Sequence, residues 1–144
     1  MLIGEYRSRL TSGNRTALPK KFREALGENM IITRGFEGCI IVVSPKQWKK
    51  ILSEAASGPF VSGSVRDTSR FLIGGAYEVA LDRQGRFVIP SSLKEYANLS
   101  GEVCFLGLLR WVEIWSVDFW EKRKTYLARH SSEIAERLAS IGEV

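Results

Sequence analysis

The sequence has few of the residues that build metal sites and disulfide frameworks. Its 144 residues include one histidine, His130, and two cysteines, Cys39 and Cys104. A Cys/His zinc site needs more ligands than these three side chains supply, and a disulfide framework needs more cysteines. Both cysteines lie inside apolar segments, which favours buried thiols in a reducing cytoplasm. We therefore expect no metal and no cofactor.

Long hydrophobic runs are also missing. No apolar stretch approaches the roughly 20 residues that a helix needs to cross a bilayer. Met1 is followed by Leu-Ile-Gly-Glu-Tyr, without the basic segment and apolar core of a signal peptide. We therefore expect a cytoplasmic protein that has no membrane partner.

The residue combinations that commonly carry catalysis are absent as well. The sequence contains no Ser-His-Asp or Cys-His combination and no glycine-rich phosphate loop. An enzyme is the less favoured interpretation, and we expect a protein without catalytic activity.

The composition is that of a globular protein with a small excess of positive charge. Hydrophobic residues make up 44% and charged residues 26%. Lysine and arginine outnumber aspartate and glutamate by 21 to 16, which gives a net charge of +5. This excess is compatible with an anionic partner such as nucleic acid, but many proteins without such a partner share it.

The sequence contains an internal repeat of basic and apolar residues. Residues 4–10 (Gly-Glu-Tyr-Arg-Ser-Arg-Leu) align with residues 75–81 at an offset of 71, and the register continues through Arg15 with Arg86 and Pro19 with Pro90. At an offset of 72, the matches are Gly35 with Gly107, Ser44 with Ser116 and Trp48 with Trp120. Because tryptophan is rare, the Ser-x-x-x-Trp match favours duplication over chance similarity.

Each half of the repeat predicts the same order of elements. Alternation of polar and apolar residues predicts strands at 6–10 and 77–81, and Gly13-Asn14 and Gln84-Gly85 predict tight turns before return strands. Pro19 and Pro90 suit the first turn of short helices. The remaining expected elements are strands at 30–33, 39–43, 103–106 and 112–115, and helices that begin at Ser44, Ser64 and Ser116, with a last helix ending at Gly142.

The predicted fold is α+β and mainly β. We divide the chain into a first repeat (1–56), a linker with a short helix (57–72), a second repeat (73–130) and a helical tail (131–144). Because units this short fold poorly alone, we expect the two repeats to share one core across a pseudo-twofold axis. The expected core includes the large aromatic residues Phe105, Trp48, Trp115 and Trp120.

The Arg-x-x-x-Pro element in each half is the main candidate for a binding site. Arginine presents a planar fork that bonds guanine or phosphate bidentately, so Arg15 and Arg86 are the favoured DNA contacts. Further candidates lie close to them in sequence: Arg7, Arg9, Arg83, Lys20, Lys21 and Arg23. A solvated helix face explains the two lysines and Arg23 equally well. For Asp82 we favour an ion pair with Arg86 that clamps a turn, and Pro19 and Pro90 are structural.

The same residues resemble the MraZ family over nearly the whole chain. The resemblance is carried by residues 82–90 (Asp-Arg-Gln-Gly-Arg-Phe-Val-Ile-Pro), residues 15–23 (Arg-Thr-Ala-Leu-Pro-Lys-Lys-Phe-Arg) and residues 112–115 (Val-Glu-Ile-Trp). It implies a tandem-duplicated, AbrB-like (SpoVT-type) swapped-hairpin β-barrel with flanking helices. It also implies a nucleoid-associated bacterial regulator, a repressor, of the division and cell-wall gene cluster. Such a regulator forms ring-shaped homo-oligomers on short direct repeats of double-stranded DNA in its own promoter.

The family pattern Asp-x-x-x-Arg is kept in one half only. The second half has Asp82 and Arg86, whereas the first has Thr11 before Arg15. A role that needs a carboxylate in both halves is therefore not available, and the first arm, with Arg15 and its neighbouring lysines, is the expected main DNA contact. The alternative function is an AbrB-like interaction or antitoxin-type module that uses the tail after Arg129.

Overall fold

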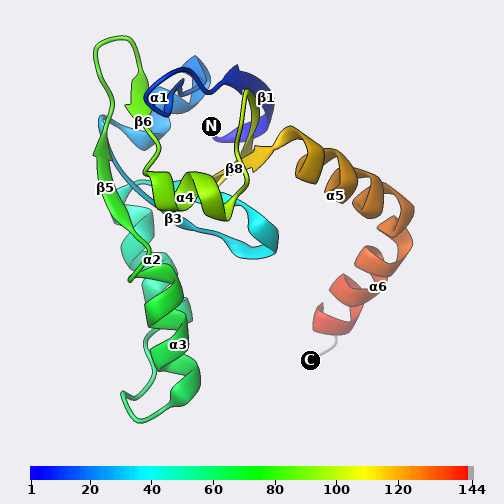
Figure 1. Ribbon diagram of the computed structural model, residues 1–144. Coiled ribbons are helices and arrows are strands. Elements are labelled where there is room, and N and C mark those ends of the chain that lie inside the picture. The colour runs from blue at the N-terminus through cyan, green and yellow to red at the C-terminus, as the bar shows by residue number, and fades with distance from the viewer. Residues whose placement is uncertain (143–144) are drawn as a thin grey trace.

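A computed structural model describes residues 1–142. Along the chain the elements are β1 (Ile3–Arg9), β2 (Arg15–Ala17), α1 (Lys20–Leu26), β3 (Asn29–Arg34), the 3₁₀ turn η1 (Phe36–Gly38), β4 (Ile40–Val43), α2 (Pro45–Ala55), α3 (Gly63–Leu72), β5 (Tyr77–Ala80), β6 (Arg86–Val88), α4 (Ser91–Tyr96), β7 (Glu102–Leu108), β8 (Val112–Ser116), α5 (Val117–Arg129) and α6 (Ser131–Gly142) (Figure 1). The expected order of strands and helices is confirmed.

The strands form two antiparallel sheets. The larger sheet has six strands in the order β1-β7-β8-β4-β3-β5, and the smaller one consists of β2 and β6. Strand β1 pairs with β7, while β5 pairs with β3, so each outer strand pairs with a strand from the other half of the chain. At the centre, β4 pairs with β8, with Ile40 opposite Ile114.

The hairpins expected around Arg15 and Arg86 do not form as continuous ladders. One isolated bridge joins Thr11 to Arg15, and beyond it β2 pairs with β6 instead of returning along β1. A closed barrel is not found among residues 1–142, because β1 and β5 are opposite edges of the large sheet and the short β2 and β6 pair only with each other. The architecture is a mixed α/β fold with a mainly antiparallel sheet and flanking helices.

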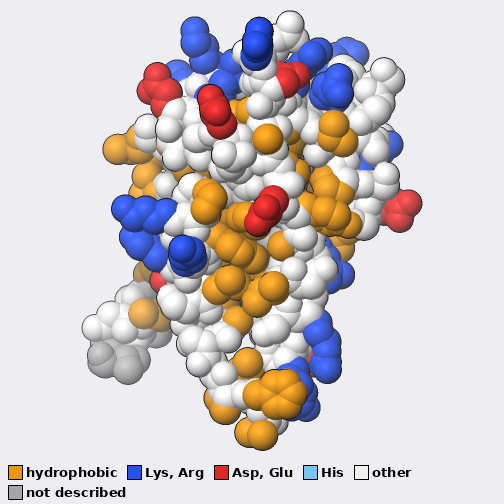
Figure 2. All heavy atoms as spheres, turned by 90° about the vertical axis from the view of Figure 1, so that its left-hand side faces the viewer, with side chains coloured by type: hydrophobic (Ala, Val, Ile, Leu, Met, Phe, Trp, Pro, Cys, Tyr) orange, Lys and Arg blue, Asp and Glu red, His pale blue; other side chains and the backbone are white. Residues whose placement is uncertain are grey.

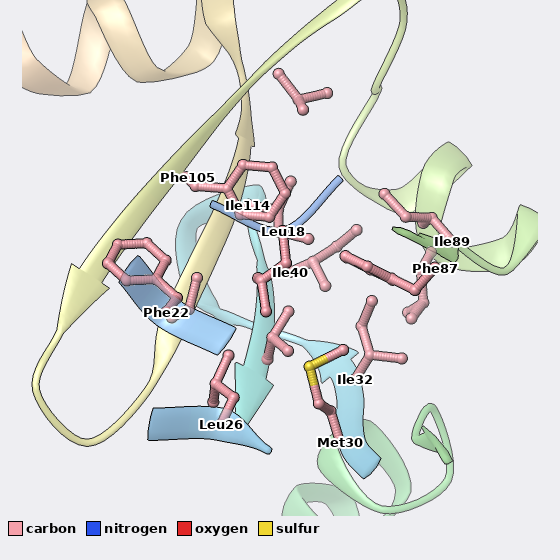
Figure 3. Close-up of a cluster of buried hydrophobic side chains, with 14 of the residues drawn as sticks. Leu18, Phe22, Leu26, Met30, Ile32, Ile40, Phe87, Ile89, Phe105 and Ile114 are labelled. Atoms are coloured by element: carbon pink, nitrogen blue, oxygen red, sulfur yellow. The ribbon is translucent and has the colours of Figure 1, made fainter. Parts of the chain in front are cut away.

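One hydrophobic cluster draws side chains from both halves of the chain. Leu18, Phe22 and Met30 meet Phe87 and Phe105 within it (Figure 3). All five are 0–2% exposed. Full burial of a side chain of this size stabilises a fold by about 1.5–3 kcal/mol, so this cluster holds the two halves together.

A smaller cluster contains two of the four aromatic residues expected in the core, while Phe105 lies in the larger cluster. Trp115 and Trp120 pack with their ring centroids 5.6 Å apart beside the buried thiols Cys39 and Cys104. Burial is the largest cause that raises the pKa of Cys104, to about 12, so this thiol stays protonated at neutral pH. Trp48 differs from the expectation because it is only half-buried on α2, a helix that has no buried residue.

The helices begin close to where the sequence predicts. The hydroxyls of Ser44 and Ser116 accept hydrogen bonds from the amides three residues later, at 3.3 and 3.1 Å, at the starts of α2 and α5. The linker helix α3 ends against β3, where Thr33 Oγ1 donates to the carbonyl oxygen of Leu72 at 2.6 Å. Figure 1 shows α3 below the strands and the α5–α6 pair to their right. In residues 1–142 no helix is both long and apolar enough to cross a membrane.

The core makes a direct stability prediction. Phe22 is fully buried and packs edge-on against Tyr6, with ring centroids 5.2 Å apart. We expect Phe22→Ala to lower the free energy of unfolding by about 3–5 kcal/mol, because it removes buried area and leaves a cavity. Phe60→Ala is the matched control, since Phe60 is 84% exposed. This substitution should change the free energy of unfolding by less than about 0.5 kcal/mol. Urea denaturation of both variants measures the difference, and equal losses would contradict this core.

Candidate nucleic-acid interface

The pairing of β2 with β6 places the two repeated arginines on one exposed face. Arg15 lies opposite Val88, Thr16 opposite Phe87 and Ala17 opposite Arg86. Side chains alternate between the faces of a strand, so Thr16 and Phe87, both 2% exposed, point inward. Arg15, Ala17, Arg86 and Val88 form the outward face, which we call the ribbon face.

The ribbon face has dimensions that suit a DNA groove. Arg15 and Arg86 are diagonal neighbours across the pair, a position that places the two residues about 7–8 Å apart and their Cβ atoms somewhat closer. This spacing is close to two base-pair steps, and the major groove of B-DNA admits a two-stranded ribbon. Both arginine side chains are exposed and can reach a partner outside the chain.

The turns that precede the two arginines differ in what they do to the arginine side chain. In the second turn, residues 82–86, Asp82 Oδ1 accepts from the amides of Gln84 and Arg86, and Asp82 Oδ2 accepts from Arg86 Nε at 3.0 Å. In the first turn, residues 11–15, Thr11 Oγ1 donates to the carbonyl oxygen of Arg15. The guanidinium of Arg86 is thus oriented by a carboxylate, whereas that of Arg15 has no salt bridge within residues 1–142.

The hydrogen bonds to Asp82 change its acidity. The amide of Arg86 has the largest effect, and the amide of Gln84 and the guanidinium of Arg86 act in the same direction, so the pKa of Asp82 lies below its ordinary value of 3.8. The ion pair therefore persists at any pH near neutrality.

Each turn is fastened to the other half of the chain. The amide of Leu18 donates to the carbonyl oxygen of Gly85 at 2.9 Å, and the amide of Ile89 donates to that of Asn14 at 2.8 Å. Asn14 and Gly85 occupy corresponding repeat positions and both have positive φ, 58° and 75°. Glycine adopts this backbone conformation at little cost. Any side chain at position 85 would collide with the guanidinium of Arg23.

Arg23 of α1 lies against the second turn. Arg23 Nε donates to the carbonyl oxygen of Leu18, and its guanidinium lies against Gly85. At the first turn, Asn14 Nδ2 lies 3.4 Å from Ser91 Oγ at the start of α4. Of the basic residues in α1, Arg23 therefore contacts the second turn, which belongs to the other half of the chain.

Four other basic candidates have exposed side chains. Lys20, Lys21, Arg83 and Arg9 are exposed. Figure 2 shows lysine and arginine side chains gathered at the upper end of the molecule, where the β5–β6 turn and α1 lie in Figure 1. Lys21 also lies over the Tyr6 ring, with Nζ 6.0 Å from the centroid.

Arg7 is the candidate that the structure sets apart from the rest. Its guanidinium is 2.6 Å from Glu121 Oε1 and 3.7 Å from Glu102 Oε1, with Glu5 at 4.0 Å. Three carboxylates surround it between β1, β7 and α5, so a phosphate would have to displace them. Sequence proximity to Arg15 could not reveal this network, since Glu102 and Glu121 lie about a hundred residues away along the chain. No cluster of metal-ligating side chains occurs within residues 1–142.

The clamp at the second turn makes a pH prediction. A carboxyl group with a lowered pKa in the folded state contributes stability above its unfolded pKa and loses that contribution as the pH falls. We expect the Asp82 carboxyl to titrate with a midpoint below 3.8, measured by carboxyl-carbon NMR. In Arg86→Ala the guanidinium is gone but the amide remains, so the midpoint should rise part of the way towards 3.8. A midpoint at or above 3.8 in the unaltered chain would contradict the clamp.

Comparison with known proteins identifies the family. The model of the family described as MraZ protein, with an antitoxin-like character, matches twice, at residues 1–71 and 72–140. Three relatives are each named transcriptional regulator MraZ. The relative from Caldicellulosiruptor saccharolyticus is 38% identical over 99% of both chains, that from Caldanaerobacter subterraneus subsp. tengcongensis 39% over 96% of both, and that from Clostridium acetobutylicum 37% over 99% of both. The chain therefore belongs to the MraZ family.

Proposed function

We propose that this chain is a transcriptional regulator that binds double-stranded DNA by placing its ribbon face in the major groove. The observation that carries the proposal is the pairing of β2 with β6, which brings Arg15 and Arg86 onto one exposed face. The names of the relatives support a role in transcription. The proposal assigns no catalytic step to the chain.

Base recognition and positioning are divided among the basic residues. Arg15 and Arg86 bond bidentately to guanine O6 and N7 or to phosphate, because the guanidinium fork matches both. Lys20, Lys21, Arg83 and Arg9 contact phosphates, which fixes the orientation of the protein on the duplex but carries no sequence information. Arg23 stabilises the second turn, because its Nε donates to the carbonyl oxygen of Leu18 and its guanidinium lies against Gly85.

Assembly supplies the affinity that one protomer lacks. A ribbon of three residues per strand makes few phosphate contacts, and each neutralised phosphate changes the salt slope by only about 0.9. We propose a ring-shaped homo-oligomer on short direct repeats, in which later contacts become intramolecular and raise avidity by roughly 10²–10⁴. Each protomer is a tandem duplication of an AbrB-like, swapped-hairpin unit, consistent with the two matches to one family model and the exchange of β1 and β5.

The proposed targets follow from the family. The regulator represses the division and cell-wall gene cluster, including its own promoter, and acts in the cytoplasm on the nucleoid. The net charge of +5 favours such an anionic partner without selecting it.

The test is a gel shift on the promoter region upstream of the protein's own gene, at several salt concentrations. Arg15→Ala and Arg86→Ala should each weaken binding at least about fivefold, as loss of a bidentate contact costs about 1–3 kcal/mol. The double variant Lys20→Ala/Lys21→Ala should bind both specific and non-specific DNA more weakly. The dependence of its binding constant on salt concentration should also be less steep.

Arg70→Ala is the matched control for the loss of an exposed arginine. Arg70 lies on α3 and pairs with Asp67 at 2.8 Å, in a different element from the ribbon face. The Arg70→Ala variant should bind DNA like the unaltered protein. All the variants should have the melting temperature of the unaltered protein. If Arg15→Ala and Arg86→Ala also bind like the unaltered protein, the proposed function is wrong.

One observation favours a second candidate function, an antitoxin-type interaction module. Helix α6 contains no buried residue, and its apolar Leu138 and Ile141 are 65% and 71% exposed. An apolar helix face of this kind is typical of a partner-binding tail. Under this alternative, a stoichiometric partner protein co-purifies with the full chain and is lost in Leu138→Glu, while DNA binding is unchanged in Arg15→Ala.

A further inference from the structure

Val88 is an apolar residue in the middle of a polar, basic face. Its side chain is 45% exposed, and it lies directly opposite Arg15 on the ribbon face. Its neighbour along the strand, Phe87, is 2% exposed and points into the core. Isolated exposed apolar residues are common and need no explanation. Val88 is different in its position, because two arginines that face the same way flank it.

The chemistry of the major groove offers one apolar partner to such a residue. Guanine presents the O6 and N7 acceptors there, cytosine and adenine present amino groups, and thymine presents its C5 methyl group. Directly opposite residues of an antiparallel pair have Cβ atoms about 4.5–5.5 Å apart, somewhat more than one base-pair step. A base contacted by Val88 is therefore next to the base contacted by Arg15.

We infer that Val88 is a specificity-determining residue that contacts the methyl group of a thymine adjacent to the guanine bound by Arg15. This inference rests on the proposed function and adds to it the identity of a base. It assigns to Arg15 and Val88, which face each other across β2 and β6, a two-base reading unit of guanine and thymine.

The corresponding pair on the other side of the ribbon face lacks this contact. The repeat equates Val88 with Ala17 and Arg86 with Arg15, so the second unit consists of Arg86 and Ala17. Ala17 is half-buried and lacks the two γ-methyl groups of valine, and Arg86 is held by Asp82 whereas Arg15 is not. The ribbon face is thus chemically unequal from one side to the other. An unequal face matches a non-palindromic site and gives each protomer one orientation on the DNA, as direct repeats require.

Replacement of thymine by deoxyuridine tests the inference because it removes only the methyl group. In the bound promoter fragment, each thymine is replaced in turn, and binding is measured for the unaltered protein, Val88→Ala and Val88→Thr. For the unaltered protein, at least one replacement should weaken binding about fourfold, which corresponds to about 0.8 kcal/mol for one buried methyl group. Val88→Ala should bind the thymine and deoxyuridine fragments equally at that position, and Val88→Thr, which keeps one methyl group, should show an intermediate ratio.

Val61→Ala is the matched control, because it makes the same chemical change at a residue that is 81% exposed in the linker. It should retain the fourfold ratio, and the melting temperatures of Val88→Ala and Val61→Ala should equal that of the unaltered protein. The inference is overturned if no deoxyuridine replacement weakens binding of the unaltered protein, or if Val88→Ala retains the fourfold ratio. Either result, together with weakened binding by Arg15→Ala, would leave the proposed function intact, whereas full binding by Arg15→Ala would remove both.

Discussion

The pairing of β2 with β6 is the constraint on which the candidate interface depends. Three residues per strand give this sheet little intrinsic stability. It is held by the Leu18–Gly85 and Ile89–Asn14 backbone hydrogen bonds on either side, and by Phe87 packed into the shared core beneath it. Because each of these contacts joins one half of the chain to the other, the ribbon face exists only when both halves are folded together.

The sequence was sufficient to predict which segments become strands and helices, because period-two alternation, capping serines and turn glycines are local signals. It also equated Arg15 with Arg86 through the repeat. It could not predict which strands would pair, since backbone hydrogen bonds are alike in every register and partners are chosen by the packing of distant side chains. The expected hairpins therefore became a cross-pairing, and Arg23 of α1 came to lie against Gly85 of the second turn. For the same reason, the carboxylates that surround Arg7 could not be found by reading its neighbours in the chain.

The one departure from the family pattern has a local electrostatic consequence. Asp82 accepts three hydrogen bonds and orients Arg86, which reduces the side-chain freedom that binding would otherwise cost that arginine. Thr11 preserves the shape of the first turn through its bond to the carbonyl oxygen of Arg15 but leaves the guanidinium without a carboxylate. In the proposed complex with DNA, the clamped Arg86 has less freedom to lose, while the unclamped Arg15 retains its full charge and can adjust to its target.

Under the proposed function, specificity and affinity come from different levels of structure. A single ribbon face reaches only a few bases, so its two arginines and Val88 can define a short, oriented site but not bind it tightly. Repetition of the protomer multiplies affinity without adding any new type of contact. Because the ribbon face is unequal across its width, every protomer in such an assembly must approach the DNA in the same orientation. In the proposed binding mode, the inequality between Val88 and Ala17 thus links a difference of two methyl groups to the head-to-tail order of the DNA repeats.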